Sequence, residues 1–543
     1  MTTNDDNTEK TLDLPPQSQR RGISILLFSV CVAASCAIVY ELIIASISSY
    51  LLGNSIYHFS ITIGLFMSSM GLGSFLSKYF VRRLIDRFIL IEVAIGLLGG
   101  ISTVLLFWIY VYSGSDIGYF AVMFALIVSI GTLVGLEIPV LTRIMKQYGS
   151  LRMTLANVLA FDYIGALVGS IAFPLVLLKY LGLVQTAFVV GFLNVLVAAA
   201  VLFQYWRDVG KRFALAVSAS LAGLALLIAS VRGASISERL EADIYNNQIV
   251  LSTQSKYQKI VLTRLGNAWP DEPQTNEQQR AIIAKRSNDL RLFIDGQLQF
   301  SSVDEYRYHE ALVHPAMGMA RKRDAVLILG GGDGLAAREV LKYGDVQRII
   351  LVDIDPEITR ICSTNPEIVA LNQGSLTHPK VVIVNQDAYK FVEKTNEVFD
   401  VIIIDLPDPN HESLSKLYAV EFYRLIARVL SPGGSLVTQS TSPFFARAAF
   451  WCIHHSIEAA GLHTVAYHLE VPSMGDWGFN LASNRPIDVK NIPLRVETLY
   501  LTQSYLPAMF EFGKDVAEIE TSVNTLLRPI LMDYYNDKRW TYY

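Results

Sequence analysis

The chain has 543 residues, of which 52% are hydrophobic and only 17% are charged, and its mean hydropathy is +0.36. These values lie outside the usual range for soluble globular proteins and indicate membrane-spanning segments. A net charge of −4 without a basic stripe excludes a nucleic-acid partner. No CxxC or metal-ligand spacing occurs among Cys31, Cys36, Cys362 and Cys452, so no metal site is expected.

The N-terminal part of the chain is predicted to be a membrane domain. Residues 1–21 are polar and are expected to form a disordered tail. The apolar stretch that follows runs past residue 45, too long for the core of a cleaved signal peptide. Within 22–232, seven apolar segments are long enough to cross a bilayer. They are 23–51, 55–80, 88–112, 117–142, 155–178, 182–205 and 213–231. We therefore expect an α-helical membrane bundle of about seven helices.

Positive charges predict the orientation of this bundle. They gather in the tail and in alternate loops, for example at Arg82, Arg83 and Arg87, whereas the loops between have almost none. The positive-inside rule then predicts a multi-pass protein of the cell (inner) membrane with a cytoplasmic N-terminus. Seven helices would leave the C-terminal half outside, and the sequence leaves the side of that half open.

Four acids lie inside the expected membrane segments, at Glu41, Glu92, Glu137 and Asp162. Acids are costly in a bilayer, so a functional interpretation is the default. Binding or conducting a polycation is one use, and hydrogen bonding between neighbouring helices is the structural alternative.

The C-terminal half is predicted to contain two kinds of sheet. Residues 236–300 hold short alternating runs at 248–251, 259–263 and 290–294, which indicate a small antiparallel sheet with a polar insertion at 266–289. Residues 301–485 alternate between strand and helix patterns, which predicts a Rossmann-like, doubly wound α/β domain of the class I methyltransferase type. Strands are expected at 325–329, 348–352, 380–384, 400–404 and 433–439. Residues 486–543 are expected to form an amphipathic helical extension that covers the site or packs on the membrane half.

The most informative segment is 326–334, Val-Leu-Ile-Leu-Gly-Gly-Gly-Asp-Gly, where an apolar strand breaks into glycines before a helical pattern at 335–343. This is the first βα turn of a nucleotide-binding fold. Asp353 stands 20 residues beyond Asp333 at the end of the next strand, where an acid can hold both ribose hydroxyls.

Acids recur where the expected strands end. They are Asp333, Asp353, Asp355, Asp387, Asp405 and Asp408. A row of acids at one sheet edge forms a negative cleft, which selects a cationic substrate. The Gly-rich turn has no Lys-Ser/Thr ending for phosphate binding. The nucleoside is therefore expected to lack phosphates.

Residues 236–485 resemble the spermidine synthases, the polyamine aminopropyltransferases. The matching segments occur in order at 255–259 (SKYQK), 293–299 (FIDGQLQ), 304–310 (DEYRYHE), 330–334 (GGGDG), 353–355 (DID), 387–388 (DA) and 405–409 (DLPDP). With its N-terminal membrane domain, the chain resembles the transmembrane branch of that family. The Gly-rich turn alone is shared with methyltransferases, whereas the ordered set is specific.

The resemblance implies transfer of an aminopropyl group from decarboxylated S-adenosylmethionine to an amine, by default putrescine, giving spermidine and methylthioadenosine. It implies no permanently bound cofactor. A carboxylate must take the amine's proton, which suggests Asp405 as the base and Tyr308 as a hydroxyl that orients the amine. The family residues expected at the amine are His309, Asp333, Asp408 and Gln299. Those expected at the nucleoside are Gln258, Asp353, Asp387, Ala388, Gly330 and Gly332. The expected partners are polyamine and nucleoside small molecules, the lipid bilayer and a second copy in a homodimer.

Several of these residues have structural alternatives. Asp405 could belong to a turn, Asp353 to a loop and Gln258 to a surface strand. His309 could be a core histidine with satisfied hydrogen bonds, and Tyr308 could be a core aromatic residue. Asp355 precedes Pro356 and could be a helix N-cap.

The chain departs from the family pattern at the amine end. Val471 stands where the family has a tyrosine that helps to bind the amine, and Asp476 or Trp477 is the candidate substitute. This leaves the acceptor open between putrescine, a longer diamine and spermidine. Leu406-Pro407 also replaces the family's Ser or Thr between the two late aspartates.

Two other functions remain open from the sequence. A methyltransferase on the same fold would use intact S-adenosylmethionine, although the acid Asp333 would repel its carboxylate. A membrane polyamine transporter or sensor would use the soluble half as a binding module and would depend on Glu41 or Glu137 rather than on Asp405.

Overall fold

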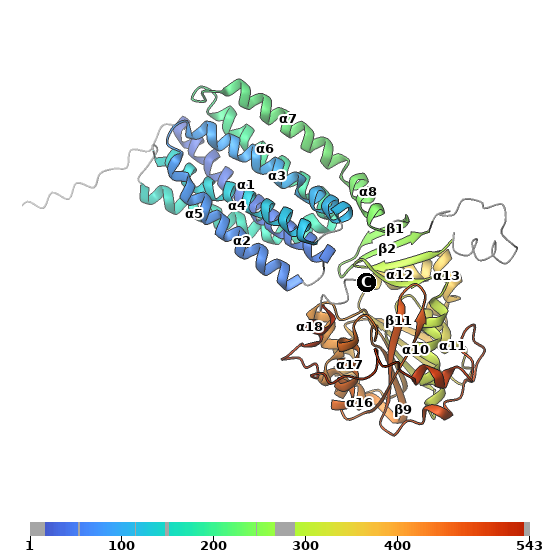
Figure 1. Cartoon of the computed structure of the whole chain (residues 1–543). Helices are drawn as coiled ribbons and strands as arrows, with labels where there is room; N and C mark the ends of the chain where they lie inside the picture. Colours follow the sequence, from blue (N-terminus) through green and yellow to red (C-terminus); the bar gives the residue numbers. More distant parts are fainter. Residues whose placement is uncertain are drawn as a thin grey trace, which may run out of the picture. The chain divides into compact units, whose positions relative to one another are not determined.

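The computed structural model describes residues 17–52, 55–113, 116–146, 151–245, 247–265 and 288–536. The chain divides into two compact units, Met1–Ile244 and Tyr245–Tyr543 (Figure 1). The expected tail lies outside the described residues as far as residue 16, and residues 17–21 already belong to the first helix. Most of the polar insertion expected at 266–289 also lies outside them.

The first unit is helical. Its long helices are α1 (Gln17–Leu52), α2 (Ser55–Leu76), α3 (Leu84–Ser113), α4 (Asp116–Met145), α5 (Leu151–Ala172), α6 (Leu178–Gln204) and α7 (Arg212–Val231). By length and composition, the described residues contain six helical segments able to cross a membrane. One of them, Arg152–Gln204, has 53 residues and combines α5, the π-helical turn η3 (Phe173–Leu177) and α6. The backbone leaves helical geometry inside it at Gly182 (φ 68°).

A further helix, α8 (Gly233–Tyr245), precedes the first strand. We expected the small β domain to begin at residue 236, but the division into compact units assigns the chain through Ile244 to the helical unit. The many polar residues of this amphipathic helix made it look like part of the domain that follows.

The small sheet of the second unit is antiparallel, with strand order β1-β2-β3-β4. Its strands are β1 (Gln248–Gln254), β2 (Lys259–Arg264), β3 (Leu290–Ile294) and β4 (Gln297–Ser301). The fourth strand was not predicted. It follows β3 through Asp295-Gly296, both with positive φ (47° and 82°), as a two-residue hairpin turn requires.

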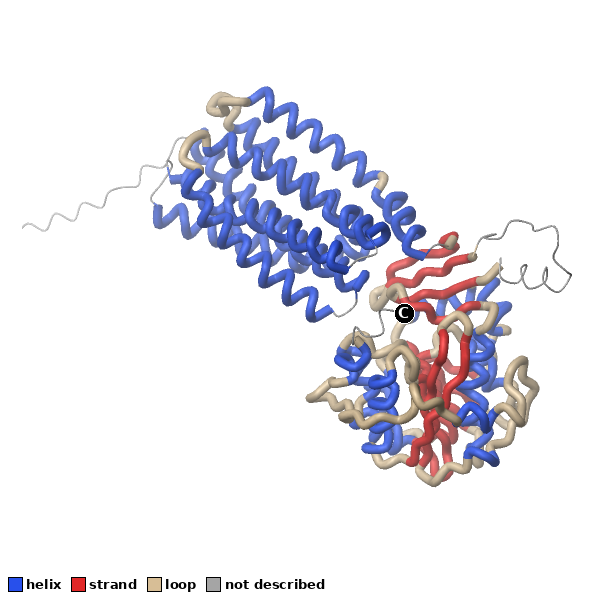
Figure 2. The backbone as a smooth tube through the Cα atoms, viewed as in Figure 1, coloured by secondary structure: helices blue, strands red, loops and turns tan. Residues whose placement is uncertain are grey.

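The large sheet has seven strands in the order β10-β11-β9-β8-β5-β6-β7. Figure 2 shows its strands in red with helices in blue around them. Its parallel strands are β5 (Ala325–Gly330), β6 (Arg348–Asp353), β7 (Val381–Asn385), β8 (Phe399–Asp405) and β9 (Leu430–Gln439). All five strands expected from the sequence are present, and the doubly wound prediction is confirmed. The order reverses beside β5, which places the ligand crevice at the carboxyl ends of β5 and β8.

Buried residues explain the layers. Val326 and Ile328 join one apolar core with helices α10 (Glu305–Met319) and α11 (Leu335–Leu341). Leu327 and Leu329 join a second core on the opposite face, with α16 (Val420–Val429) and α17 (Arg447–Ala459). Because both faces are covered, the central strands β5 and β8 are nearly continuous apolar runs.

The sheet is completed by an antiparallel hairpin, β10 (His463–Val471) and β11 (Gly475–Ser483), which was not predicted. Its β11 strand pairs with β9. Val471 is 1% exposed and belongs to the apolar core, so a valine at this position serves packing.

The prediction of a helical extension at 486–543 was wrong for the part that the structure describes. Through residue 536 the segment contains only two short 3₁₀ turns, Val489–Asn491 and Leu506–Phe510, and one five-residue helix, α18 (Leu531–Tyr535). Prolines at 486, 493, 507 and 529 recur too often for a long helix. The apolar residues that suggested an amphipathic helix instead pack on the α/β domain, among them Leu501, Leu506 and Leu531.

Candidate active site

The Gly-rich turn after β5 allows three strand ends to meet closely. Gly330 has φ 84°, and a Cβ atom there would collide with the backbone oxygen of Asp405 at the end of β8. A Cβ atom on Gly332 would collide with the carboxylate of Asp353 at the end of β6. Glycine is therefore required where the turn touches two acids of the candidate site.

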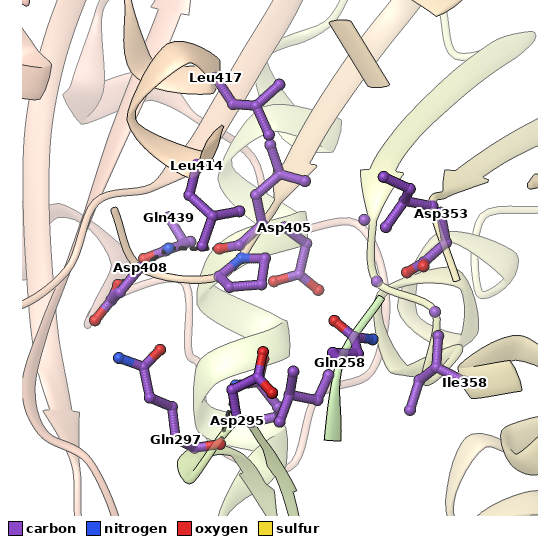
Figure 3. Close-up of a pocket in the computed structure, with 18 of the residues that line it drawn as sticks. Gln258, Asp295, Gln297, Asp353, Ile358, Asp405, Asp408, Leu414, Leu417 and Gln439 are labelled. Carbon is purple, nitrogen blue, oxygen red and sulfur yellow. Dashed lines mark hydrogen bonds between the residues drawn. The ribbon is translucent and has the colours of Figure 1, made fainter. Parts of the chain in front are cut away.

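A cavity of about 310 Å³ opens at these strand ends (Figure 3). The twelve residues that the sequence assigned to catalysis, amine binding or nucleoside binding all line it. They are Gln258, Gln299, Tyr308, His309, Gly330, Gly332, Asp333, Asp353, Asp387, Ala388, Asp405 and Asp408. In Figure 3, Gln258 and Gln297 approach from the small sheet, opposite Asp405 and Asp408. The cavity thus lies between the small sheet and the large one.

Asp405 and Tyr308 form a hydrogen-bonded pair at this cavity. The Tyr308 hydroxyl donates to Oδ1 of Asp405 over 2.7 Å. Burial and the charge of Asp333 raise the pKa of Asp405 to about 6, against the opposing effects of His309 and Tyr308. Burial and Asp405 raise the pKa of Tyr308 well above its usual value, so Tyr308 remains the donor. The pair provides a carboxylate that can exchange a proton near neutral pH.

His309 carries positive charge into the same cluster. Its Nδ1 lies 2.8 Å from the backbone oxygen of Glu305 and 2.9 Å from Glu305 Oε2, and Arg338 donates to both carboxylate oxygens of Glu305. Burial opposes protonation, but the bond to Glu305 and the charges of Asp333 and Asp405 raise the pKa of His309 to about 9. His309 is therefore an imidazolium at neutral pH.

Ligand atoms of His309, Asp333 and Asp405 lie within 4.8 Å of one another, a spacing that suits a metal ion. A metal would need a neutral imidazole. The raised pKa of His309 favours a proton on the imidazole, which opposes metal ligation by this set.

Asp408 lies at the other end of the acid row and is held by three donors. It accepts from Tyr535 (2.9 Å), Gln439 (3.2 Å) and Thr441 (3.4 Å). Burial raises its pKa to about 6 against these bonds. Gln439 also donates to the Leu406 backbone oxygen over 2.6 Å, which ties the loop after β8 to β9.

The opposite side of the cavity holds Asp353 and Asp387. Burial raises the pKa of Asp353 to about 7, and its Oδ1 accepts the backbone N–H of Asp355 over 2.9 Å. Asp387 caps α14 (Ala388–Lys394) through the Lys390 N–H and forms an ion pair with Lys416 at 2.8 Å. Burial tends to raise the pKa of Asp387, but the ion pair with Lys416 and the hydrogen bond from Lys390 lower it overall.

Asp355 is a structural residue, as its N-cap alternative predicted. It caps α12 (Pro356–Thr364) by accepting the backbone N–H of Glu357, and its Oδ2 accepts the Ser255 hydroxyl over 2.6 Å. It does not line the cavity.

Of the two candidates to replace the family tyrosine, only Trp477 lines the cavity. Its indole Nε1 is buried without a partner in the described residues. The carboxylate of Asp476 lies 2.6 Å from His468 Nδ1, so it is engaged elsewhere.

Sequence reasoning missed several residues at the site, namely Tyr257, Asp295, Gln297, Lys416, Gln439 and Tyr535. Asp295 and Gln297 flank a Gly inside the matching segment 293–299, which was a usable signal. Tyr535 stands 127 residues from Asp408, and no local pattern marked it.

A nucleotide-type sheet with an acid-lined cleft defines a class of enzymes that bind a nucleoside beside a cationic substrate. Residues 305–491 match the family model described as spermine/spermidine synthase domain. A polyamine aminopropyltransferase of Oceanobacillus iheyensis is 39% identical over 530 residues, covering 96% of this chain and 99% of the relative. Another, of Leptospira interrogans, is 41% identical over 523 residues, covering 95% and 98%. The crystal structure of Thermotoga maritima spermidine synthase is similar at 25% identity and a TM-score of 0.42, covering 50% of this chain and 86% of that one.

The chain belongs to the spermine/spermidine synthase family, and it is an aminopropyltransferase. The similarity to the two curated relatives extends over nearly the full chain, including the helical unit. It favours aminopropyl transfer over the methyltransferase alternative on the same fold.

Proposed function

We propose that this enzyme transfers the aminopropyl group of decarboxylated S-adenosylmethionine to putrescine, giving spermidine and methylthioadenosine. The observation that carries the proposal is the Tyr308–Asp405 pair, placed in one cavity with Asp333 and Asp408. This arrangement supplies a proton acceptor beside carboxylates that attract ammonium groups.

The donor nucleoside binds on the side of the Gly-rich turn. Asp353 holds the ribose hydroxyls, as an acid at the end of the second strand can. Asp387 and Ala388 hold the adenine, Gln258 contacts the nucleoside from the small sheet, and Gly330 and Gly332 let the ligand approach the backbone. Asp333 attracts the ammonium group of the decarboxylated donor and disfavours a donor that keeps its carboxylate.

The transfer step needs a neutral amine. Asp405 accepts a proton from the acceptor's ammonium group, and Tyr308 fixes the carboxylate's orientation. The amine lone pair then attacks the propyl carbon bonded to the sulfonium. As the new C–N bond forms, the C–S bond breaks and its electron pair returns to sulfur, which leaves neutral methylthioadenosine. Much of the rate comes from holding the amine in line with the departing sulfur.

The acceptor's far ammonium group binds at Asp408, and Gln299 and His309 line the amine side of the cavity. Tyr535 supplies a hydroxyl at Asp408 in place of the family hydroxyl missing at Val471. Because Asp408 is the acid farthest along the row, its distance from the base selects the length of the acceptor. Putrescine is the default acceptor of the family.

The test is a product assay on the full-length protein in detergent, with decarboxylated S-adenosylmethionine and a panel of amines. Mass spectrometry should detect methylthioadenosine and a matching aminopropylated amine, with putrescine as the best acceptor. Asp405→Asn should lose product while retaining methylthioadenosine binding. A matched control is Asp400→Asn near the other end of β8, where the carboxylate accepts from Ser431 and the Ala325 backbone.

Two results would contradict this proposal. One is full turnover by Asp405→Asn, and the other is a methylated product from intact S-adenosylmethionine. A better rate with spermidine than with putrescine would correct the acceptor alone.

We further propose that the helical unit spans the cell (inner) membrane seven times, with the N-terminus in the cytoplasm, and that the protein forms a homodimer. A helix of 53 residues would extend about 80 Å, well beyond the roughly 30 Å hydrocarbon core of a bilayer. The non-helical backbone at Gly182 therefore supports two crossings by Arg152–Gln204.

Reporter fusions at the two ends test this topology. Alkaline phosphatase is active only outside the cytoplasm. Seven crossings with a cytoplasmic N-terminus therefore predict an active fusion after residue 543 and an inactive fusion before residue 1. Equal behaviour at both ends would require an even number of crossings.

A further inference from the structure

The helical unit contains a polar cluster that the transfer reaction does not use. It is built by Tyr40 on α1, Glu92 on α3, Glu137 on α4 and Asn194 on α6, all between 0% and 5% exposed. Asn194 Nδ2 donates to Glu92 Oε2 over 3.0 Å. Four helices of the bundle thus contribute one side chain each.

Two observations support treating these side chains as one group. Glu92 and Glu137 interact electrostatically with each other, and both act on the hydroxyl of Tyr40. Close helix packing places them there, because a Cβ atom on Gly96 would meet the Gly191 backbone and the Asn194 side chain. Small residues commonly allow membrane helices to approach in this way.

The cluster has more buried acceptors than its own donors satisfy. Glu92 Oε1, Glu137 Oε1 and Asn194 Oδ1 are all buried without a partner among the described residues, as is the Tyr40 hydroxyl. The first three atoms are acceptors. A buried acceptor without a donor costs roughly 1–3 kcal/mol, and more where the group is charged. A group that brings several donors would satisfy these oxygens, and a positive charge on it would also offset any charge on the two glutamates.

We propose that this cluster is a binding site for the ammonium group of a polyamine within the helical unit. A primary ammonium carries three N–H donors and no acceptor, which matches the three open oxygens. The methylene chain of a polyamine suits the apolar side chains beside the cluster, such as Val195 and Leu226. The site is separate from the catalytic cavity and does not depend on the chemistry proposed there. It gives the helical unit a function in binding or moving polyamines.

The test counts binding sites in the full-length protein reconstituted in lipid nanodiscs. Equilibrium dialysis with radiolabelled spermidine should give about two equivalents for the wild type. The double variant Glu92→Gln/Glu137→Gln should bind about one equivalent and keep aminopropyl transfer. The matched control is Glu41→Gln, which removes a buried acid of α1 that is not part of the cluster. It should retain two equivalents.

Aminopropyl transfer is measured in the same samples. A variant that keeps this activity is folded, so its loss of one equivalent reflects loss of the second site. Asn194→Leu, which removes one open acceptor without changing an acid, should lower affinity at the second site at least tenfold. The proposal is overturned if the double variant still binds two equivalents, or if the wild type binds only the catalytic one. Displacement of the second equivalent by equimolar sodium would also overturn it, because the site would then be an alkali-cation site. Failure of aminopropyl transfer in the wild type would instead count against the proposed function.

Discussion

The hydroxyl of Tyr308 and Oδ1 of Asp405 lie 2.7 Å apart, although the two residues are 97 positions apart in the chain. Tyr308 lies on α10, which precedes the large sheet in the sequence. Asp405 is the last residue of β8, the central strand of that sheet. The bond leaves the second carboxylate oxygen available to an incoming ammonium group. It also stabilises the ionised form of Asp405, which is the form that accepts a proton.

Replacing Tyr308 by Phe should lower kcat by about 10- to 100-fold. A hydrogen bond to a charged group contributes roughly 1.5–3 kcal/mol, and the rate loss follows from that range. Steady-state assays with decarboxylated S-adenosylmethionine and putrescine provide the measurement. Tyr306→Phe, on the same helix but outside the cavity lining, is the control and should be close to wild type. An unchanged kcat in Tyr308→Phe would remove this tyrosine from the mechanism.

The pH dependence of kcat/KM should show an acidic limb with a midpoint near 6. Burial raises the pKa of Asp405 and of Asp408 to about 6 in the free enzyme. Below this pH both become protonated, so the base and the ammonium-binding charge proposed above are lost together and activity should fall as pH decreases. Because the Tyr308 bond lowers the pKa of Asp405, Tyr308→Phe should move the midpoint upward. A profile flat down to pH 4.5 would rule out Asp405 as the base.

The central parallel strands and their terminal acids could be predicted because burial on both faces makes β5, β6 and β8 nearly continuous apolar runs. The site followed from the same reasoning, since carboxyl ends of neighbouring parallel strands meet at one edge. On this reasoning Asp333, Asp353, Asp355, Asp387, Asp405 and Asp408 were predicted at one edge, and all of them except Asp355 line one cavity.

Long-range contacts could not be predicted in this way. Tyr535 donates to Asp408 from a segment whose apolar residues resembled an amphipathic helix, whereas its prolines and its packing on the sheet decide its conformation. Lys416 reaches Asp387 from 29 residues away, on a short helical turn with no distinctive pattern. Both depend on tertiary packing that local propensity does not encode.

Replacing Arg338 by Met should destabilise the α/β domain by roughly 3–5 kcal/mol, because the buried Glu305 carboxylate loses its two-pronged ion pair and keeps only His309 as a charged partner. Arg338 and Glu305 are both buried, with contacts of 2.8 and 2.9 Å. The measurement is hydrogen exchange of α10 and α11 amides in the full-length protein. Arg360→Met, which breaks the exposed pair with Glu357, should leave exchange unchanged. Equal protection in both variants would show that the Glu305 network does not hold α10.

Replacing Tyr535 by Phe should raise the KM for putrescine about tenfold, with little change in the KM for the nucleoside donor. Tyr535 is 7% exposed and donates to Asp408 over 2.9 Å, so its removal leaves this carboxylate with one fewer donor and a higher pKa. Tyr534→Phe is the matched control, since the neighbouring hydroxyl only accepts from the Ser522 backbone over 3.3 Å. An equal rise in both Michaelis constants would mean that Tyr535 stabilises the cavity as a whole. A rise in the KM for the amine alone, larger for putrescine than for longer diamines, would mean that the C-terminal segment determines which acceptor length the site binds.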